Sequence, residues 1–265
     1  MTSIAVVGAA LVLMMILAGA CYRQWRRNQA LQEQLQSAAA DLEHLQLACS
    51  RLAPAGVVRQ LVADGTRDAA VAAEHKIATA LFVDLVGFTQ MSERLEPAVL
   101  VHILNGYYQR MSDAIDEHRG QVGSYIGDGI VAYFGALQPN PWQCDDAVRA
   151  ALAMREAIRV YNVELDREGL PQLSIGVGIH RGLGLAGLVG SRERKEFSFL
   201  GSPVNLAARV QALTRLHQVD ILVTEALCAE LDKSILLTPM PPERLKGFAE
   251  PVVTYAVKGT SRDDA

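Results

Sequence analysis

Residues 121–134 read QVGSYIGDGIVAYF. Two short apolar runs, 121–126 and 130–134, flank the turn-forming sequence Gly127-Asp128-Gly129, a pattern that is typical of a β-hairpin. A helical pattern precedes this hairpin and another follows it. The hairpin therefore provides the central strand pair from which the order of the other elements is read.

The segments on either side of the hairpin alternate between strand and helix patterns. Upstream, residues 78–83 form an apolar run typical of a buried strand, and residues 96–118 carry apolar side chains at helical spacing. Downstream, residues 145–166 form a second helical pattern, residues 173–179 a further strand and residues 202–214 a helix. The order β-α-β-β-α-β predicts an α+β, ferredoxin-like fold with its helices on one face of the sheet.

Composition excludes several classes of protein. Half of the 265 residues are hydrophobic and 20% are charged, which is too apolar for a disordered protein. The 25 Lys and Arg residues against 29 Asp and Glu give a net charge of −4, so we expect no nucleic-acid partner bound through a basic surface. The four cysteines include no CxxC pair, which argues against a disulfide scaffold or a zinc site.

The N-terminal segment is different from the rest of the chain. Residues 1–22 contain no charged side chain, and as a helix they would be about 33 Å long, close to the ~30 Å hydrocarbon core of a bilayer. Arg23, Arg26 and Arg27 follow, which by the positive-inside rule places the remaining chain in the cytoplasm. We therefore expect a transmembrane helix over 1–22 and a single-pass protein of the inner or plasma membrane. A cleaved signal peptide is the alternative.

Residues 23–53 show the spacing of a coiled coil. Apolar residues recur at alternating intervals of four and three, at Leu31, Leu35, Ala38, Leu42, Leu45, Cys49 and Leu52. Asn28 falls on the same seam, where a buried Asn favours a two-stranded parallel pair. The segment therefore predicts a dimeric coiled coil, with a single amphipathic helix as the alternative. We expect a short helix and linker over 54–75, a folded domain over 76–258 and a tail over 259–265.

Two carboxylates follow strand patterns that are neighbours in the predicted sheet. Asp84 ends the first strand and Asp128 lies in the hairpin turn. In a ferredoxin-like sheet these two positions converge at one edge, where like charges repel unless a cation lies between them. Oxygen ligands suit Mg²⁺. The alternative is that each Asp simply caps a turn.

A third element lies further along the chain, in residues 197–209, which read FSFLGSPVNLAAR. Ser202 is a good N-cap, with Pro203 at the first helical position. Asn205 and Arg209 are four residues apart, so they share one face of the helix. Together with a metal pair, such residues are suited to hold a sugar and to neutralise a phosphate.

Asp84, Asp128 and the segment from Asn205 to Arg209 together resemble the class III nucleotidyl cyclases of the adenylate/guanylate type. The resemblance implies a cyclase catalytic domain over 76–258 that works as a homodimer, with sites shared between the two copies. By this resemblance Asp84, Asp128 and the backbone carbonyl of Leu85 hold two Mg²⁺ or Mn²⁺ ions per site. Asn205 would orient the ribose, and Arg209 would stabilise charge at the α-phosphate.

The same resemblance implies further substrate contacts. Lys246 matches a lysine that binds the triphosphate, and Arg192 or Arg194 would add a phosphate contact. Ser124 and Ser198 stand where the family selects the purine. ATP-using members carry Lys and then Asp or Thr there, and guanylate cyclases carry Glu and Cys.

The resemblance therefore implies an adenylate cyclase that converts ATP to 3′,5′-cyclic AMP and pyrophosphate by two-metal, in-line attack of the 3′-hydroxyl. A guanylate or mixed-specificity cyclase is the first alternative, because the two serines match neither pair. A degenerate nucleotide-binding signalling dimer is the second. A diguanylate cyclase ranks last, because the hairpin reads Ile-Gly-Asp-Gly-Ile rather than Gly-Gly-Asp-Glu-Phe. No upstream regulator is identified.

One further glycine pattern fits a dinucleotide-binding motif. Gly182, Gly184 and Gly187 have the GxGxxG spacing. No Asp or Glu follows about 20 residues later, as that motif requires. We therefore expect these glycines to serve a tight hairpin.

Overall fold

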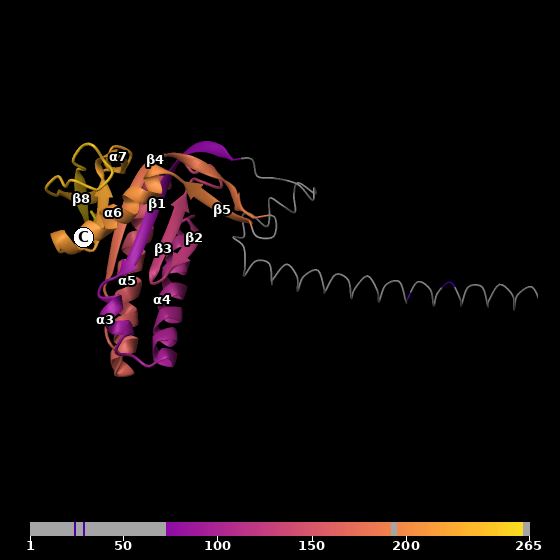
Figure 1. Ribbon diagram of the computed structural model, residues 1–265, viewed down its shortest axis with the longest axis vertical. Helices are drawn as coiled ribbons and strands as arrows, with labels where there is room; N and C mark the ends of the chain where they lie inside the picture. Colours follow the sequence, from indigo (N-terminus) through magenta and orange to yellow (C-terminus); the bar gives the residue numbers. More distant parts are fainter. Residues whose placement is uncertain (1–23, 25–28, 30–72, 192–194, 262–265) are drawn as a thin grey trace, which may run out of the picture. The chain divides into compact units, whose positions relative to one another are not determined.

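The computed structural model describes Gln24, Gln29 and residues 73–191 and 195–261 (Figure 1). The chain divides into two units, Met1–Ala53 and Pro54–Ala265. The predicted helix over 1–22, the predicted coiled coil over 23–53 and most of the predicted linker lie outside the described residues. The domain boundaries therefore stay predictions.

The predicted membrane localisation is corrected by the structure. Within residues 73–191 and 195–261, no helix is both long enough and apolar enough to cross a bilayer. The two long helices, α4 (Pro97–Glu117) and α5 (Gln143–Arg167), are amphipathic and carry charged residues on their exposed faces. This finding contradicts a single-pass membrane protein, and we withdraw that assignment.

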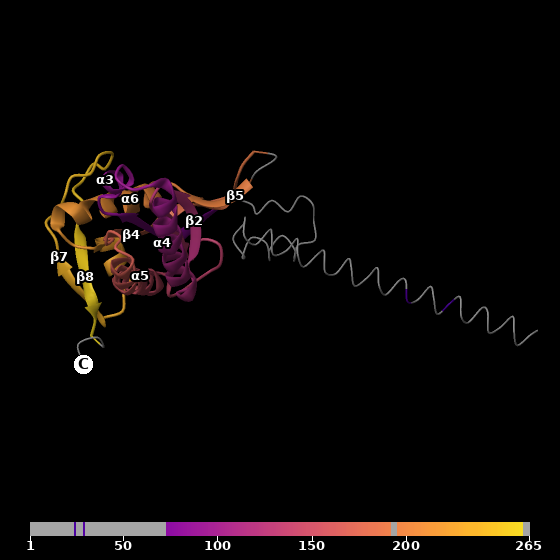
Figure 2. The same cartoon turned by 90° about the horizontal axis from the view of Figure 1, so that it is seen from below.

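The described strands form one mixed sheet of eight in the order β2-β3-β1-β4-β6-β8-β7, with β5 paired to β4. Figure 2 shows β7 and β8 on the side of the described domain opposite β2, in line with their places at the two ends of the sheet. The strands are β1 Glu74–Leu85, β2 Gln121–Ile126, β3 Gly129–Phe134, β4 Ile175–Gly190, β5 Lys195–Leu200, β6 Ile221–Thr224, β7 Ile235–Pro239 and β8 Thr254–Thr260. The central order β2-β3-β1-β4, with α4 and α5 as its two long helices, is the predicted α+β, ferredoxin-like core.

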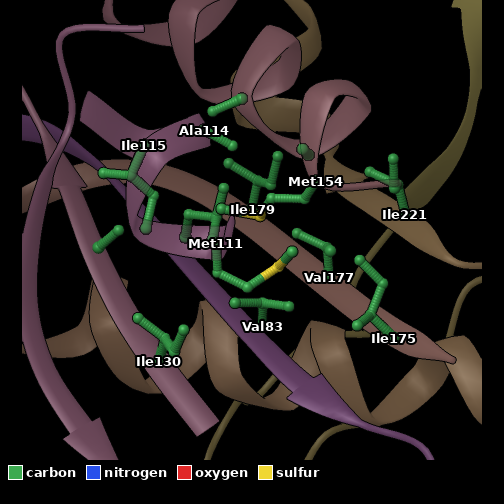
Figure 3. Packing of buried hydrophobic residues seen from close by; sticks show 14 of the residues in the cluster. Val83, Met111, Ala114, Ile115, Ile130, Met154, Ile175, Val177, Ile179 and Ile221 are labelled. Atoms are coloured by element: carbon green, nitrogen blue, oxygen red, sulfur yellow. The ribbon is translucent and has the colours of Figure 1, made fainter. Parts of the chain in front are cut away.

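The main core lies between the sheet and two helices. α4 and α5 run next to each other in both views and cover one face of the sheet (Figures 1 and 2). Figure 3 shows Met111 of α4 and Met154 of α5 meeting Val83, Val177 and Ile179 of the sheet. These apolar contacts fix the sheet edge at which β1 and the β2–β3 hairpin end.

The opposite face of the sheet is covered as well. α6 (Ser202–His217) places Ala207 in a second buried cluster with Ala78, Ala80 and Phe199. The expectation of helices on one face therefore holds for α4 and α5, whereas α6 lies on the other face. Two short helices complete the described elements, α3 (Phe88–Ser92) and α7 (Glu225–Cys228).

Glycines in β4 allow the backbone of α6 to pack closely against the sheet. A Cβ atom at Gly178 would lie 2.2 Å from the backbone nitrogen of Gln211 and 2.3 Å from the carbonyl oxygen of Ala207. The helix backbone therefore rests directly on the strand. The three glycines 182, 184 and 187 lie inside β4 and not in the β4–β5 turn: Gly182 and Gly184 pair with β1, and Gly187 pairs with β5.

Candidate functional site

The structure brings two of the predicted site residues, Asp84 and Asp128, together at one edge of the sheet. Asp84 is the second-last residue of β1, and Asp128 lies in the turn between β2 and β3. β1 pairs with β3 up to Val83 opposite Ile130, so the strand end and the hairpin turn are neighbours. The carboxyl groups of Asp84 and Asp128 are close enough that Asp128 raises the pKa of Asp84.

The electrostatics of this pair favour a cation. Burial first, and then the hydrogen-bonding and the negative charge of Asp128, raise the pKa of Asp84 to about 7. Arg215 and a backbone hydrogen bond at Leu85 act in the opposite direction. Two neighbouring carboxyl groups that repel each other in this way favour sharing a proton or binding a cation at neutral pH.

The donor set suits a hard divalent ion. Asp84 and Asp128 supply carboxylate oxygens, and Leu85 supplies a main-chain carbonyl, which are the ligand types that Mg²⁺ and Mn²⁺ take in proteins. Across residues 73–191 and 195–261 there is no group of three or more His, Cys, Asp or Glu side chains placed for a metal. Ions held here would therefore keep open positions for water or for phosphate oxygens.

Arg215, which sequence reasoning missed, lies against two of these three ligands. Its Nη2 donates a hydrogen bond of 3.0 Å to the carbonyl oxygen of Leu85 and lies 3.6 Å from Oδ2 of Asp84. The sequence alone gives no signal for this contact, because it depends on how the C-terminal end of α6 crosses β4 toward the end of β1.

The hairpin turn is fastened to α4 by tyrosines. The hydroxyl of Tyr108 donates to the carbonyl oxygen of Gly127, next to Asp128. Tyr125 of β2 lies edge-on to Tyr108, with ring centres 4.9 Å apart, and its hydroxyl lies 2.8 Å from that of Ser112. These contacts hold the turn, and with it the Asp128 carboxylate, in one position.

Tyr107 is a second group that sequence reasoning missed, because it falls among the apolar side chains at helical spacing in residues 96–118. Its side chain is fully buried, and its hydroxyl has no hydrogen-bond partner among the described residues. Burial, followed by the charges of Asp84 and Asp128, raises its pKa well above the usual value. The phenol therefore stays protonated beneath the carboxylate pair.

Asn205 and Arg209 lie on α6, as predicted. The helix begins differently from the expectation: Gly201, at φ 124°, is the N-cap residue, and Ser202 and Pro203 already lie in the first turn. Glycine takes that backbone angle without strain. Because glycine has no side chain, no side-chain cap forms at this position. Asn205 is exposed, whereas Nη1 of Arg209 is buried and lacks a partner among the described residues.

Arg209 packs against the segment that contains Lys246. The guanidinium of Arg209 lies 5.3 Å from the ring centre of Phe248, and a Cβ atom at Gly247 would be 3.1 Å from its Nη1. Lys246 itself is exposed. The structure thus places Arg209 and the Lys246 segment together.

The remaining predicted residues lie on two strands and in an undescribed loop. Ser124 on β2 and Ser198 on β5 are both half-buried. Arg192 and Arg194 lie outside the described residues.

The site residues form two sets on different sides of α6. Arg215 follows Arg209 by six positions, which is about 9 Å along the helix and roughly 240° around it. Arg209 accordingly faces Phe248, whereas Arg215 faces Asp84. One set contains the carboxylates, and the other contains Asn205, Arg209 and the Lys246 segment.

The chain matches known proteins over this whole region. The family model described as "Adenylate and Guanylate cyclase catalytic domain" matches residues 70–259. An adenylate cyclase of Anabaena cylindrica is 36% identical over 202 residues, which cover 71% of this chain and 38% of that protein. Adenylate cyclase 1 of Rhizobium meliloti is 29% identical over 191 residues, which cover 72% of this chain and 29% of that protein. The chain therefore spans about a third of the length of these relatives.

Solved structures share the fold. The adenylyl cyclase CyaB from P. aeruginosa has a TM-score of 0.67 at 28% identity, covering 72% of this chain and 98% of that one. The guanylyl cyclase Cya2 also has a TM-score of 0.67, at 30% identity, covering 71% of this chain and 94% of that one. The fold is thus equally similar to an adenylyl and to a guanylyl cyclase.

Proposed function

Because this chain belongs to the family of adenylate and guanylate cyclase catalytic domains, we propose that it converts ATP into 3′,5′-cyclic AMP and pyrophosphate. The observation that carries the proposal is the meeting of Asp84 and Asp128 at one sheet edge, with the pKa of Asp84 raised to about 7. The 36% identity to an adenylate cyclase supports ATP as the substrate.

The carboxylate set is the proposed metal site. Asp84, Asp128 and the carbonyl of Leu85 hold two Mg²⁺ or Mn²⁺ ions. When bound, such ions lower the pKa of the ribose 3′-hydroxyl and neutralise charge on the phosphates. Tyr108 keeps Asp128 in place through Gly127, which supports a fixed geometry at that ligand.

The α6 set is the proposed nucleotide-binding and transition-state set. Asn205, which is exposed, orients the ribose. Arg209 donates to the α-phosphate as charge develops there, and groups of this kind act most strongly in a site that excludes water. Lys246 binds the triphosphate, and Arg192 or Arg194 adds a phosphate contact.

We further propose that a second copy of the chain completes each site. The two sets face different sides of α6, so the carboxylates of one copy would work with Asn205 and Arg209 of the other. This arrangement supports a homodimer with two equivalent sites.

A guanylate or mixed-specificity cyclase is the second candidate. The half-buried hydroxyls of Ser124 and Ser198 each donate or accept a hydrogen bond, so they do not discriminate between the purine edges. The equal TM-scores of 0.67 to a guanylyl and an adenylyl cyclase are consistent with either substrate.

The test is incubation of the full chain with Mn²⁺ or Mg²⁺ and either ATP or GTP, with the products separated. We expect 3′,5′-cyclic AMP and pyrophosphate from ATP. Ser124→Lys combined with Ser198→Asp should raise the ratio of ATP to GTP turnover, and an unchanged ratio would remove these residues from the purine site. Formation of neither cyclic nucleotide would instead support a nucleotide-binding signalling dimer.

A further inference from the structure

Arg215 occupies the space beside the carboxylate pair where a cation is expected. Its Nη2 donates 3.0 Å to the carbonyl oxygen of Leu85 and lies 3.6 Å from Oδ2 of Asp84. These are two of the three groups proposed to hold metal, so a single guanidinium contacts both a carboxylate and the main-chain ligand. A divalent ion cannot use the same oxygens at full strength while those contacts remain.

The contacts of Arg215 are of moderate strength, so it can be displaced. Its side chain is 54% exposed, and that of Asp84 is 25% exposed. A partly exposed ion pair of this kind is weaker than a buried one, because water screens the charges. A divalent ion carries twice the charge and binds the oxygens directly, so it should prevail when it is present in sufficient concentration.

The structure also offers a place for the displaced side chain. Arg215 lines a cleft of about 780 Å³ together with Val86, Thr214 and Gln218. Asp220 lines the same cleft and is held by Arg155. A guanidinium that leaves Asp84 would therefore enter an open cleft, whose carboxylate at Asp220 is already paired with Arg155.

We propose that Arg215 is an internal cation that competes with metal for Asp84 and the Leu85 carbonyl, so that metal binding requires the side chain to move into this cleft. The inference rests on the proposed metal site and adds to it a residue that opposes metal binding. Only the fraction of molecules with Arg215 turned away binds metal at full strength, which weakens the apparent affinity by that fraction.

The test measures Mn²⁺ binding without nucleotide, by calorimetry and by the spin-resonance signal of free Mn²⁺, on the full chain at pH 8.5. Arg215→Gln removes the charge, and we expect it to bind Mn²⁺ roughly three- to tenfold more tightly than the wild type. Arg215→Lys keeps the charge but loses the planar fork, so it should fall between the two.

Lys258→Gln is the matched control. Lys258 lines the same cleft, and its substitution removes the same charge, but among the described residues the ion pair to Asp84 is made by Arg215 and not by Lys258. It should bind Mn²⁺ as the wild type does. Asp84→Asn serves as the reference and should lose most of the binding.

The outcomes separate the two claims. If Arg215→Gln binds Mn²⁺ no more tightly than the wild type, or if Lys258→Gln gains as much, the competition by Arg215 is overturned, while loss of binding in Asp84→Asn leaves the proposed function standing. If Asp84→Asn binds Mn²⁺ as well as the wild type, the metal site is wrong and both claims fail.

Discussion

Asp84 shows how far single residues could be predicted from the sequence. Its position at the end of a strand, and that of Asp128 in a hairpin turn, are local patterns, and the strand order then brings them together. Arg215 and Tyr107 could not be found in this way. Their roles depend on the crossing of α6 over β4 and on the burial of α4, which are set by tertiary packing.

The pKa of Asp84 leads to a pH dependence of metal binding. Because that pKa is raised to about 7, the carboxyl is protonated in the folded protein at pH 5.5 and ionised at pH 8. We expect Mn²⁺ to raise the melting temperature at pH 8 and to have little effect at pH 5.5. At a free Mn²⁺ concentration ten times Kd the gain is about 1.4 kcal/mol. Thermal unfolding with and without Mn²⁺ at the two pH values measures this.

In the metal-free protein, the contribution of Asp84 to folding stability changes with pH in the opposite direction. A carboxyl whose folded pKa is raised stabilises the fold fully below its unfolded pKa, near 3.8, and loses that stabilisation as the pH rises to about 7. Asp84→Asn should therefore flatten the pH dependence of unfolding between these values and also abolish the Mn²⁺ effect at pH 8. An equal Mn²⁺ effect at pH 5.5 and pH 8 would contradict the assignment of Asp84 as a ligand.

At the scale of elements, the long helices and the hairpin were predicted nearly to their ends, and the glycine-rich strand was not. β4 runs to Gly190, whereas the apolar pattern predicted a strand that ends at residue 179. Glycine is rare in strand interiors, so its presence hid the second half of β4. Here it is needed, because a Cβ atom at Gly184 would lie 2.5 Å from the ring of Phe199.

Gly178 offers the sharpest test of how α6 is held. In Gly178→Ala the new Cβ atom would meet the backbone of Gln211 at 2.2 Å, so the helix must move. Such overpacking should lower the free energy of unfolding by about 1–3 kcal/mol, and it should reduce cyclase activity because α6 carries Asn205 and Arg209. Urea unfolding and product assays measure the two effects.

Gly169→Ala is the comparison for that variant. Gly169 has φ 70° and open space around its Cβ position, so only the backbone strain remains. We expect a loss of about 1 kcal/mol without a loss of activity in the folded protein. Equal effects of the two variants on activity would show that the close packing of α6 on β4 does not affect the site.

At the scale of the whole molecule, the βαββαβ order was predictable because it rests on long periodic segments. The face covered by α6 and the strands β6, β7 and β8 were not, because segments of four to seven residues carry little periodicity unless a clear turn sequence, such as Gly127-Asp128-Gly129 between β2 and β3, marks them. The predicted membrane localisation is wrong, because no described helix can span a bilayer. The family match over residues 70–259 concerns the catalytic domain.

Sites shared between two copies predict recovery of activity on mixing. Asp84→Asn alone and Arg209→Ala alone should each be nearly inactive. In a mixed dimer one of the two sites has both residues intact, so random pairing of equal amounts should restore up to about a quarter of the wild-type activity. Absence of any recovery, with mixed dimers shown to form, would place both residues in one chain's own site.

The central claim is that Asp84 and Asp128 hold the metal ions of a cyclase. The direct measurement is the rate of 3′,5′-cyclic AMP and pyrophosphate formation from ATP and Mn²⁺ at pH 8 by the wild type, Asp84→Asn and Asp128→Asn. Arg159→Gln serves as the control, because Arg159 pairs only with Glu156 among its described ion-pair partners and is largely exposed. We expect both products from the wild type and from Arg159→Gln, and a loss of at least about 100-fold in each Asp variant. Wild-type rates in either Asp variant, or no cyclic nucleotide from the wild type, would contradict the claim.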